Sequence, residues 1–187
     1  QRSMVTVVNV FSYGFIILIS LISMTNVFNT ISTSIALRRR GEIVLGVIYD
    51  PMMDECWHVE KGGIPYMNDH PMHCSRREKM AEAVVFVGHG KTDGSKEKGI
   101  ERFAKIAWQV RKVRNNGSAA LALAYIACGR FDAYVESVIS IWDIAAGVLL
   151  VEAAGGKVVL EPKEDNPEQF AIVAWNGRIP IMEALDE

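Results

Sequence analysis

The stretch Trp142-Asp-Ile-Ala-Ala-Gly147 decides the fold; a run to Ala154 that is apolar except for Glu152 continues it, and Gly155-Gly156 closes it. Its spacing predicts one helix over 142–154, with Asp143 at the N-cap or in the first turn. An acidic side chain there can cap free backbone N–H groups or hold a cation. Such a residue taken alone is more often a cap, so its neighbours decide between the two interpretations.

A second unit, Gly117-Ser118-Ala119, opens another apolar run that predicts a helix over 118–128. Small residues let a ligand approach the backbone closely, and a helix N-terminus attracts anions. Between the two helices, residues 132–136 predict a strand ending in Glu136, seven residues before Asp143. Taken singly, Ser118 is more often an N-cap and Glu136 a solvated strand end. Together they predict two carboxylates and an anion-receptive helix start at one place.

These residues resemble the inositol monophosphatase family, the magnesium-dependent phosphomonoesterases that include sugar bisphosphatases and nucleotide phosphatases. The resemblance runs from about Ser34 to Arg178. It implies that Asp143 is a metal ligand and that Glu136 binds hydroxyls of the substrate ring. It also implies that Gly117, Ser118 and Ala119 border the substrate.

The same resemblance implies the fold class, cofactor and partners. We expect an α/β protein, a layered α-β-α-β-α sandwich that is incomplete at its N-terminus. The expected cofactor is Mg²⁺, the expected substrate a small phosphorylated polyol or sugar, and the expected assembly a homodimer. Two units are expected: an apolar segment over 1–30 and a partial inositol monophosphatase-like domain over 31–187.

The family's upstream Glu-Glu pair and Asp-Pro-Ile/Leu-Asp-Gly-Thr loop have no counterpart in this sequence. Ile16 to Ile19 stand where the loop aligns, no Asp or Glu precedes Glu42, and Asp50-Pro51 lacks the Gly-Thr that follows in the motif. Magnesium takes six oxygen ligands in near-octahedral geometry, so one protein carboxylate holds it weakly. We therefore assign no catalytic residue and expect phosphatase activity to be impaired or lost.

The segment from Met4 to Met24 is uncharged, apolar and long enough to cross a bilayer. It fits a membrane or signal-type segment, buried strands, or sequence that has replaced the missing metal loop. We favour replacement because the family pattern resumes abruptly near Thr33, so a membrane partner is not expected. The competing hypothesis is a non-catalytic binding or dimerisation module, held at a membrane by this segment.

Composition narrows the remaining functions. A net charge of −2 and a pI near 6.1 argue against nucleic acid as a partner. Three scattered cysteines indicate reduced thiols and a cytoplasmic location. The residues around Cys56-Trp57-His58 and His70 to Cys74 include soft ligands, but their spacing does not fit a zinc site. Gly88-His-Gly-Lys91 lacks the full phosphate-binding P-loop pattern and is interpreted as a turn.

The remaining elements follow from periodicity. Ile100, Phe103 and Ile106 recur at helical spacing and predict a helix over 97–110 with an apolar face, on which Trp108 is expected to pack. The other expected helices are 118–128, 142–154 and 178–185. The expected strands are 31–37, 43–49, 54–60, 83–88, 111–115, 132–136, 157–161 and 170–175.

Overall fold

Alternating sheets and helices form the layers of this protein, and its computed structural model describes residues 33–90 and 93–186. The strands are β1 (Thr33–Arg39), β2 (Glu42–Asp50), β3 (Glu55–Glu60), β4 (Tyr66–Met67), β5 (His70–Pro71), β6 (Val84–Val87), β7 (Lys112–Arg114), β8 (Ala133–Ser140), β9 (Lys157–Lys163) and β10 (Asn166–Trp175). The helices are α2 (Asp93–Ala107), α3 (Ala119–Ala127), α4 (Ile141–Ala153) and α5 (Ile181–Asp186), with a 3₁₀ turn at Met80–Glu82.

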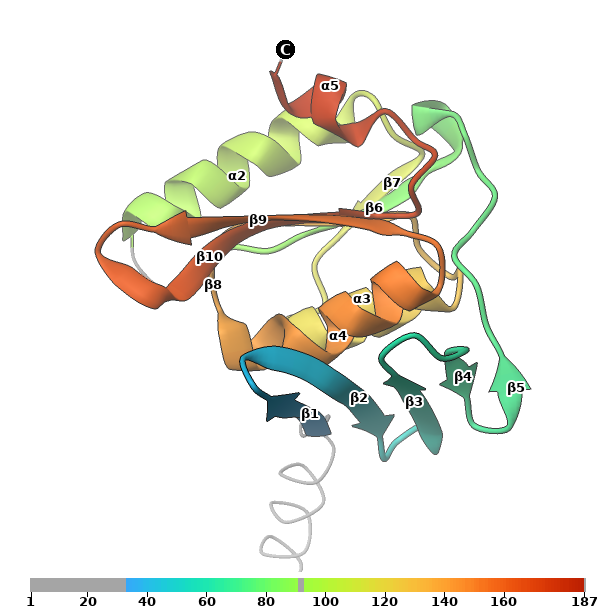
Figure 1. Cartoon of the computed structure of the whole chain (residues 1–187). Coiled ribbons are helices and arrows are strands. Elements are labelled where there is room, and N and C mark those ends of the chain that lie inside the picture. Colours follow the sequence, from blue (N-terminus) through green and yellow to red (C-terminus); the bar gives the residue numbers. More distant parts are fainter. Residues whose placement is uncertain (1–32, 91–92, 187) are drawn as a thin grey trace, which may run out of the picture.

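The strands form two sheets of five (Figure 1). The first, in the order β1-β2-β3-β4-β5, is an antiparallel meander. The second has the order β7-β6-β8-β10-β9: β6 runs parallel to β7 and β8, whereas β10 is antiparallel to β8 and β9. Helices α3 and α4 lie between the sheets, and α2 and α5 cover the far face of the second sheet (Figure 1). The predicted layered α/β sandwich is confirmed.

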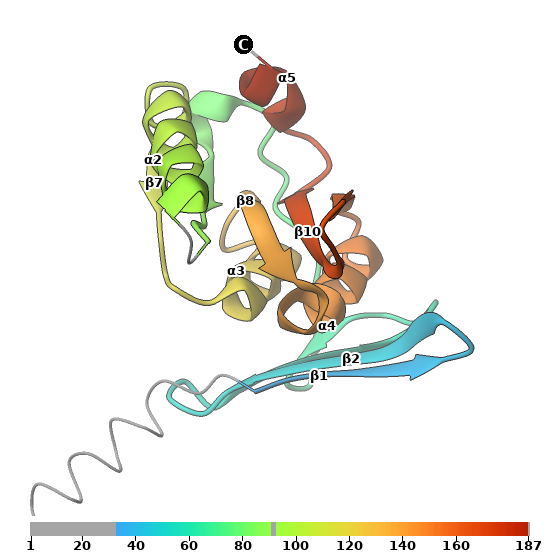
Figure 2. The same ribbon diagram turned by 90° about the vertical axis from the view of Figure 1, so that its left-hand side faces the viewer.

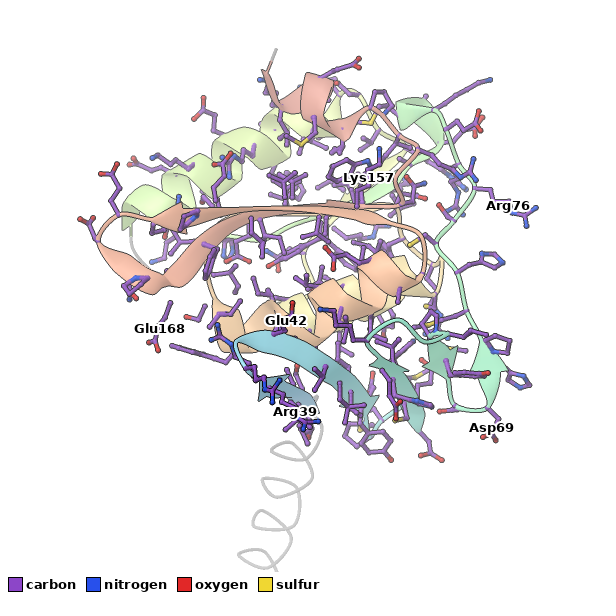
Figure 3. All side chains as sticks on the ribbon, in the orientation of Figure 1. Arg39, Glu42, Asp69, Arg76, Lys157 and Glu168 are labelled. Atoms are coloured by element: carbon purple, nitrogen blue, oxygen red, sulfur yellow. The ribbon has the colours of Figure 1, made fainter. Side chains whose placement is uncertain are left out.

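Two apolar clusters hold the layers together. One surrounds α3 and α4 and includes Trp57, Leu123 and Ile144, all buried completely. The other lies between the second sheet and the helices α2 and α5, around Val85 and Ile106. Charged side chains such as those labelled in Figure 3 lie at the periphery. The helix pair α3 and α4 therefore packs in the largest buried cluster.

Two glycines bring these layers into close contact. A Cβ built on Gly46 of β2 would lie 2.8 Å from the carbonyl oxygen of Ala146, so only glycine lets this strand approach α4 so closely. A Cβ on Gly147 of α4 would lie 2.5 Å from the Cβ of Leu123 in α3. The position of α4, which carries Asp143, thus depends on backbone contact with both neighbours.

The first sheet has one face on α4 and an outer face that no described element covers (Figure 2). Ile35 and Leu37 of β1 stand on that outer face with 56% and 54% of their surface exposed. In register beside them on β2 lie Val47 and Leu45.

Polar contacts also join the layers. The guanidinium of Arg130, just beyond α3, donates two 2.5 Å hydrogen bonds to the Glu55 carboxylate on β3. Fully buried Asp132 accepts hydrogen bonds from Ser75, Arg77 and the backbone N–H of Val84. The first contact ties the first sheet to the central helices, and the second ties a connecting segment to the second sheet.

Several expected boundaries and contacts were wrong. The helix expected over 97–110 begins at Asp93 and ends at Ala107, and Trp108 is 92% exposed instead of packed. Ile100 and Phe103 are exposed as well, while Ile106 is buried. Their periodicity marked a helix, but the sheet accepts only part of the apolar face.

The expected apolar segment bears on the question of a membrane span. The apolar stretch over 1–30 lies outside the described residues. None of the helices among residues 33–90 and 93–186 has the length and apolar character needed to cross a membrane. Asn68 and Asp69 form the tight turn of the β4–β5 hairpin, in which Asn68 adopts a φ of 52°.

Candidate active site

A cavity of about 790 Å³ opens where the carboxyl ends of β6 and β7 meet the starts of α3 and α4. Its lining includes all five residues singled out from the sequence: Gly117, Ser118, Ala119, Glu136 and Asp143. The other lining residues are Ser34, Phe86, Val87, His89, Gly90, Ser95, Asn115, Asn116, Ala120, Tyr134, Val138, Ile139, Ser140, Trp142 and Gln169. Sequence reasoning therefore located residues that the fold brings to one place.

The start of α3 is shaped by a chain of local hydrogen bonds. The Oγ of Ser118, the N-cap, accepts a hydrogen bond from the backbone N–H of Leu121 at 3.3 Å. Gly117 has a φ of 72°, and its N–H donates to the Oδ1 of Asn115 at 3.0 Å. Asn115 also donates from Nδ2 to the carbonyl of Val87, which ties this turn to the end of β6. Ser118 is thus an N-cap that also borders the cavity.

Asp143 lies in the first turn of α4, three residues after the N-cap residue Ser140. Its side chain is exposed, and no hydrogen bond or ion pair joins its carboxylate to another of the described residues. A negative charge near a helix N-terminus is stabilised by the helix dipole. The capping interpretation is therefore not what the structure shows, and the carboxylate is free to bind a cation.

Glu136 differs from its expected position at a solvated strand end. Strand β8 continues to Ser140, and Glu136 lies within it with only 7% of its surface exposed. Because β6 ends at Val87, opposite Val135, the Glu136 side chain lies beside Gly88, where an added Cβ would overlap the carboxylate. The Tyr134 hydroxyl donates a hydrogen bond to Oε2 of Glu136.

Burial is the main cause that raises the pKa of Glu136 above its ordinary value, and the nearby charge of Asp143 adds to it. The hydrogen bond from Tyr134 and the charge of His89 act in the opposite direction. No Lys or Arg is among the described residues that line the cavity. An anionic ligand here would meet two carboxyl groups and little positive charge beyond the start of α3.

Sequence reasoning missed several lining residues. Asn115 and Asn116 were not recognised, although a pair of Asn residues before Gly is a turn signal with polar side chains. His89 and Gly90 belong to the stretch 88–91, which was interpreted only as a turn. The Gly-His-Gly pattern was the available signal that backbone comes close to a site here.

The His and Cys side chains considered as zinc ligands make separate contacts of their own. His58 stacks on Tyr66 with ring centroids 5.7 Å apart, and Cys74 is buried with its thiol toward the carbonyl of Val151. Burial raises the pKa of Cys74 to about 12, which keeps it a thiol. In the described portion of the chain, no three His, Cys, Asp or Glu side chains gather closely enough to hold a metal ion.

A sequence model of the inositol monophosphatase family matches residues 22–180. The chain belongs to this family. An inositol-1-monophosphatase of Mesorhizobium japonicum is 41% identical over 147 residues, which are 78% of this chain and 55% of that protein. The Nus factor SuhB of Xylella fastidiosa is 35% identical over 162 residues, 82% of this chain and 58% of the relative.

Solved structures agree with the fold. The inositol monophosphatase of Anabaena (Nostoc) sp. PCC 7120 superposes with a TM-score of 0.76 at 33% identity, covering 87% of this chain and 66% of that one. This chain spans about half the length of the curated relatives it matches.

The residues described here do not by themselves fit a magnesium site. Asp143 offers a free carboxylate, but one oxygen of Glu136 is already bonded to Tyr134. Magnesium requires near-octahedral oxygen coordination and keeps waters where protein ligands are lacking. The described residues alone would therefore hold Mg²⁺ weakly.

Proposed function

We propose that this chain acts on small phosphorylated polyols or sugars, as a member of a family whose relatives are named as phosphatases. The observation that carries the proposal is the convergence of Gly117, Ser118, Ala119, Glu136 and Asp143 on one cavity. Hydrolysis of a phosphate monoester is the reaction that such a relative's name implies.

The cavity suits a small polar substrate. A volume of about 790 Å³ lies within the range of ordinary ligand pockets, roughly 300–1,000 Å³. Hydroxyl and amide side chains line it, among them Ser140, Asn116 and Gln169. Such groups donate and accept hydrogen bonds, as the hydroxyls of a polyol require.

Each predicted residue has a role consistent with its position. Glu136 would accept a hydrogen bond from a substrate hydroxyl. The turn from Gly117 to Ala119 would border the phosphate, because backbone N–H groups at the start of α3 favour an anion. Asp143 would contribute one ligand to Mg²⁺, the cofactor expected from the family.

The described part of the cavity offers few metal ligands. Among the described residues a single free carboxylate lies at the cavity, and the sequence has no acidic residue before Glu42, so Mg²⁺ finds too few ligands here. We therefore infer that the chain binds the substrate but hydrolyses it slowly or not at all.

Two further properties follow the family and stay predictions. We propose a homodimer, which light scattering of the purified chain would detect as twice the 20.7 kDa monomer mass. We also propose a cytoplasmic location, with which the three unpaired thiols of Cys56, Cys74 and Cys128 accord.

Binding and hydrolysis are tested separately. Saturation-transfer NMR with inositol monophosphate should show binding that Glu136→Ala weakens and Glu152→Ala, an exposed change in the same helix as Asp143, leaves unchanged. Phosphate release with Mg²⁺ should stay at background. Absence of binding by the wild-type chain would refute the substrate class, and phosphate release abolished by Asp143→Ala would refute the inferred impairment.

A further inference from the structure

Tyr134 and Glu136 form a buried pair on β8. Residues two apart on a strand point to the same face, so both side chains face the cavity. Their exposed fractions are 3% and 7%, and the Tyr134 hydroxyl donates to Oε2 of Glu136. Among the described residues, no other group donates a hydrogen bond to the Glu136 carboxylate. One of its two oxygens is thus occupied, and Oε1 is left.

Backbone lies against the same oxygen, Oε2, that accepts the hydrogen bond from Tyr134. Gly88 follows β6, and its N–H donates to the carbonyl of Val135 at 2.9 Å, which holds the glycine beside Glu136. Any side chain at position 88 would overlap the carboxylate. Strand β10 flanks β8 on its other edge, where Ile172 is in register with Glu136. The carboxylate therefore has little freedom to reorient.

We propose that Tyr134 is a positioning residue that holds Glu136 by Oε2, so that Oε1 accepts one hydroxyl of a polyol phosphate. The inference rests on the proposed function, and it adds the residue that orients the polyol-binding carboxylate. Gly88 provides the space in which the carboxylate lies.

Electrostatics support the direction of this hydrogen bond. Burial raises the pKa of Tyr134 well above its ordinary value, so the phenol keeps its proton and remains the donor. Donation by Tyr134 lowers the pKa of Glu136, against the effect of burial. The other charged groups that act on Glu136 are His89, after β6, and Asp143, in α4. Loss of the Tyr134 hydroxyl should therefore raise the pKa of Glu136 and favour its neutral form.

A merely structural Tyr134 would behave differently from a positioning one. Its ring packs in the cluster around α3 and α4, so removing the hydroxyl alone preserves that packing. Tyr125→Phe is a matched control, because Tyr125 packs against the same cluster but does not line the cavity.

The test compares Tyr134→Phe, Tyr125→Phe and the wild-type chain. Carbon-13 NMR follows the Glu136 carboxyl through a pH titration, with the signal assigned by its loss in Glu136→Gln. Calorimetry measures affinity for inositol monophosphate and for inorganic phosphate. In Tyr134→Phe we expect a higher pKa of Glu136 and about tenfold weaker binding of inositol monophosphate, the effect of one hydrogen bond to a charged group, with phosphate binding unchanged. Tyr125→Phe should change none of these.

An unchanged pKa of Glu136 in Tyr134→Phe would overturn the proposal, as would equal weakening for both ligands. If the wild-type chain binds no inositol monophosphate, the proposed function fails, and the NMR titration alone decides the role of Tyr134. If Tyr134→Phe does not fold, the test instead follows the carbon-13 signal of the Tyr134 ring in the Glu136→Gln variant. That signal should shift on loss of the carboxylate, and an unchanged signal would refute the coupling.

Discussion

Gly147→Ala tests whether the contact between α3 and α4 sets the geometry of the site. Gly147 lies one helical turn after Asp143 in α4 and faces Leu123 of α3. An added Cβ would lie 2.5 Å from the Leu123 Cβ and 2.6 Å from its Cδ1. Leu123 is completely buried, so it cannot turn away into solvent. The two helices must therefore separate or the core must rearrange.

The expected change in the free energy of unfolding is the difference between two effects. Replacing glycine by alanine within a helix stabilises by about 1 kcal/mol. Overpacking a well-packed core costs about 1–3 kcal/mol. The free energy of unfolding should therefore fall by roughly 0–2 kcal/mol. Gly94→Ala in α2 is the control, because nothing lies within 4 Å of its added Cβ, and it should not destabilise.

Urea denaturation of a double-mutant cycle gives the decisive result. Leu123→Ala alone should lower the free energy of unfolding by about 2–5 kcal/mol. In that background the obstructing atoms beyond Cβ are gone, so adding Gly147→Ala should be less harmful than in the wild-type chain. Equal stabilisation by Gly147→Ala in both backgrounds, matching Gly94→Ala, would refute the close helix contact.

Three further changes probe the charged groups. Glu136→Gln should raise the free energy of unfolding at pH 7 by roughly 0.5–2 kcal/mol. Burial raises the pKa of Glu136, so the wild-type fold loses stability as pH rises from the ordinary glutamate pKa through the raised one. Chemical denaturation at pH 4 and pH 7 would contradict this if the gain in stability did not grow with pH. Arg130→Ala should cost about 1 kcal/mol, less in high salt, since the Arg130–Glu55 pair is partly exposed. Arg130 lowers the pKa of Glu55, so this contribution is present above the ordinary glutamate pKa and is lost as pH falls through the lowered one; a pH-independent effect would count against it. Asp132→Ala should cost about 1–3 kcal/mol, because the backbone N–H of Val84 then lacks its acceptor, and an unchanged free energy of unfolding would show that the network is dispensable.

The sequence predicted which residues meet at the cavity better than it predicted their burial. The helix expected over 142–154 is observed over Ile141–Ala153, and the convergence of Asp143 with the turn at 117–119 follows from element ends meeting at one edge of the sheet. The burial of Glu136 could not be foreseen, because it depends on Gly88, just after β6, and on Ile172 of β10, which lie on either side of it.

Periodicity was a weaker guide on the far face of the sheet. The apolar spacing of Ile100, Phe103 and Ile106 correctly marked a helix, yet only Ile106 is buried. Spacing shows which side chains share a face, but the width of the contact depends on the partner layer. The contribution of Asn115 was likewise hidden, since its hydrogen bond to Val87 joins residues 28 positions apart.

Titration of Mn²⁺, followed by its electron paramagnetic resonance signal in the presence of inositol monophosphate, tests most directly whether the cavity lacks a complete metal site. Mn²⁺ prefers the same oxygen ligands as Mg²⁺ and reports bound ions spectroscopically. We expect weak binding of a single ion that disappears in Asp143→Ala and persists in Glu152→Ala. Two or more tightly bound ions that depend on Asp143 would contradict the inferred shortage of ligands.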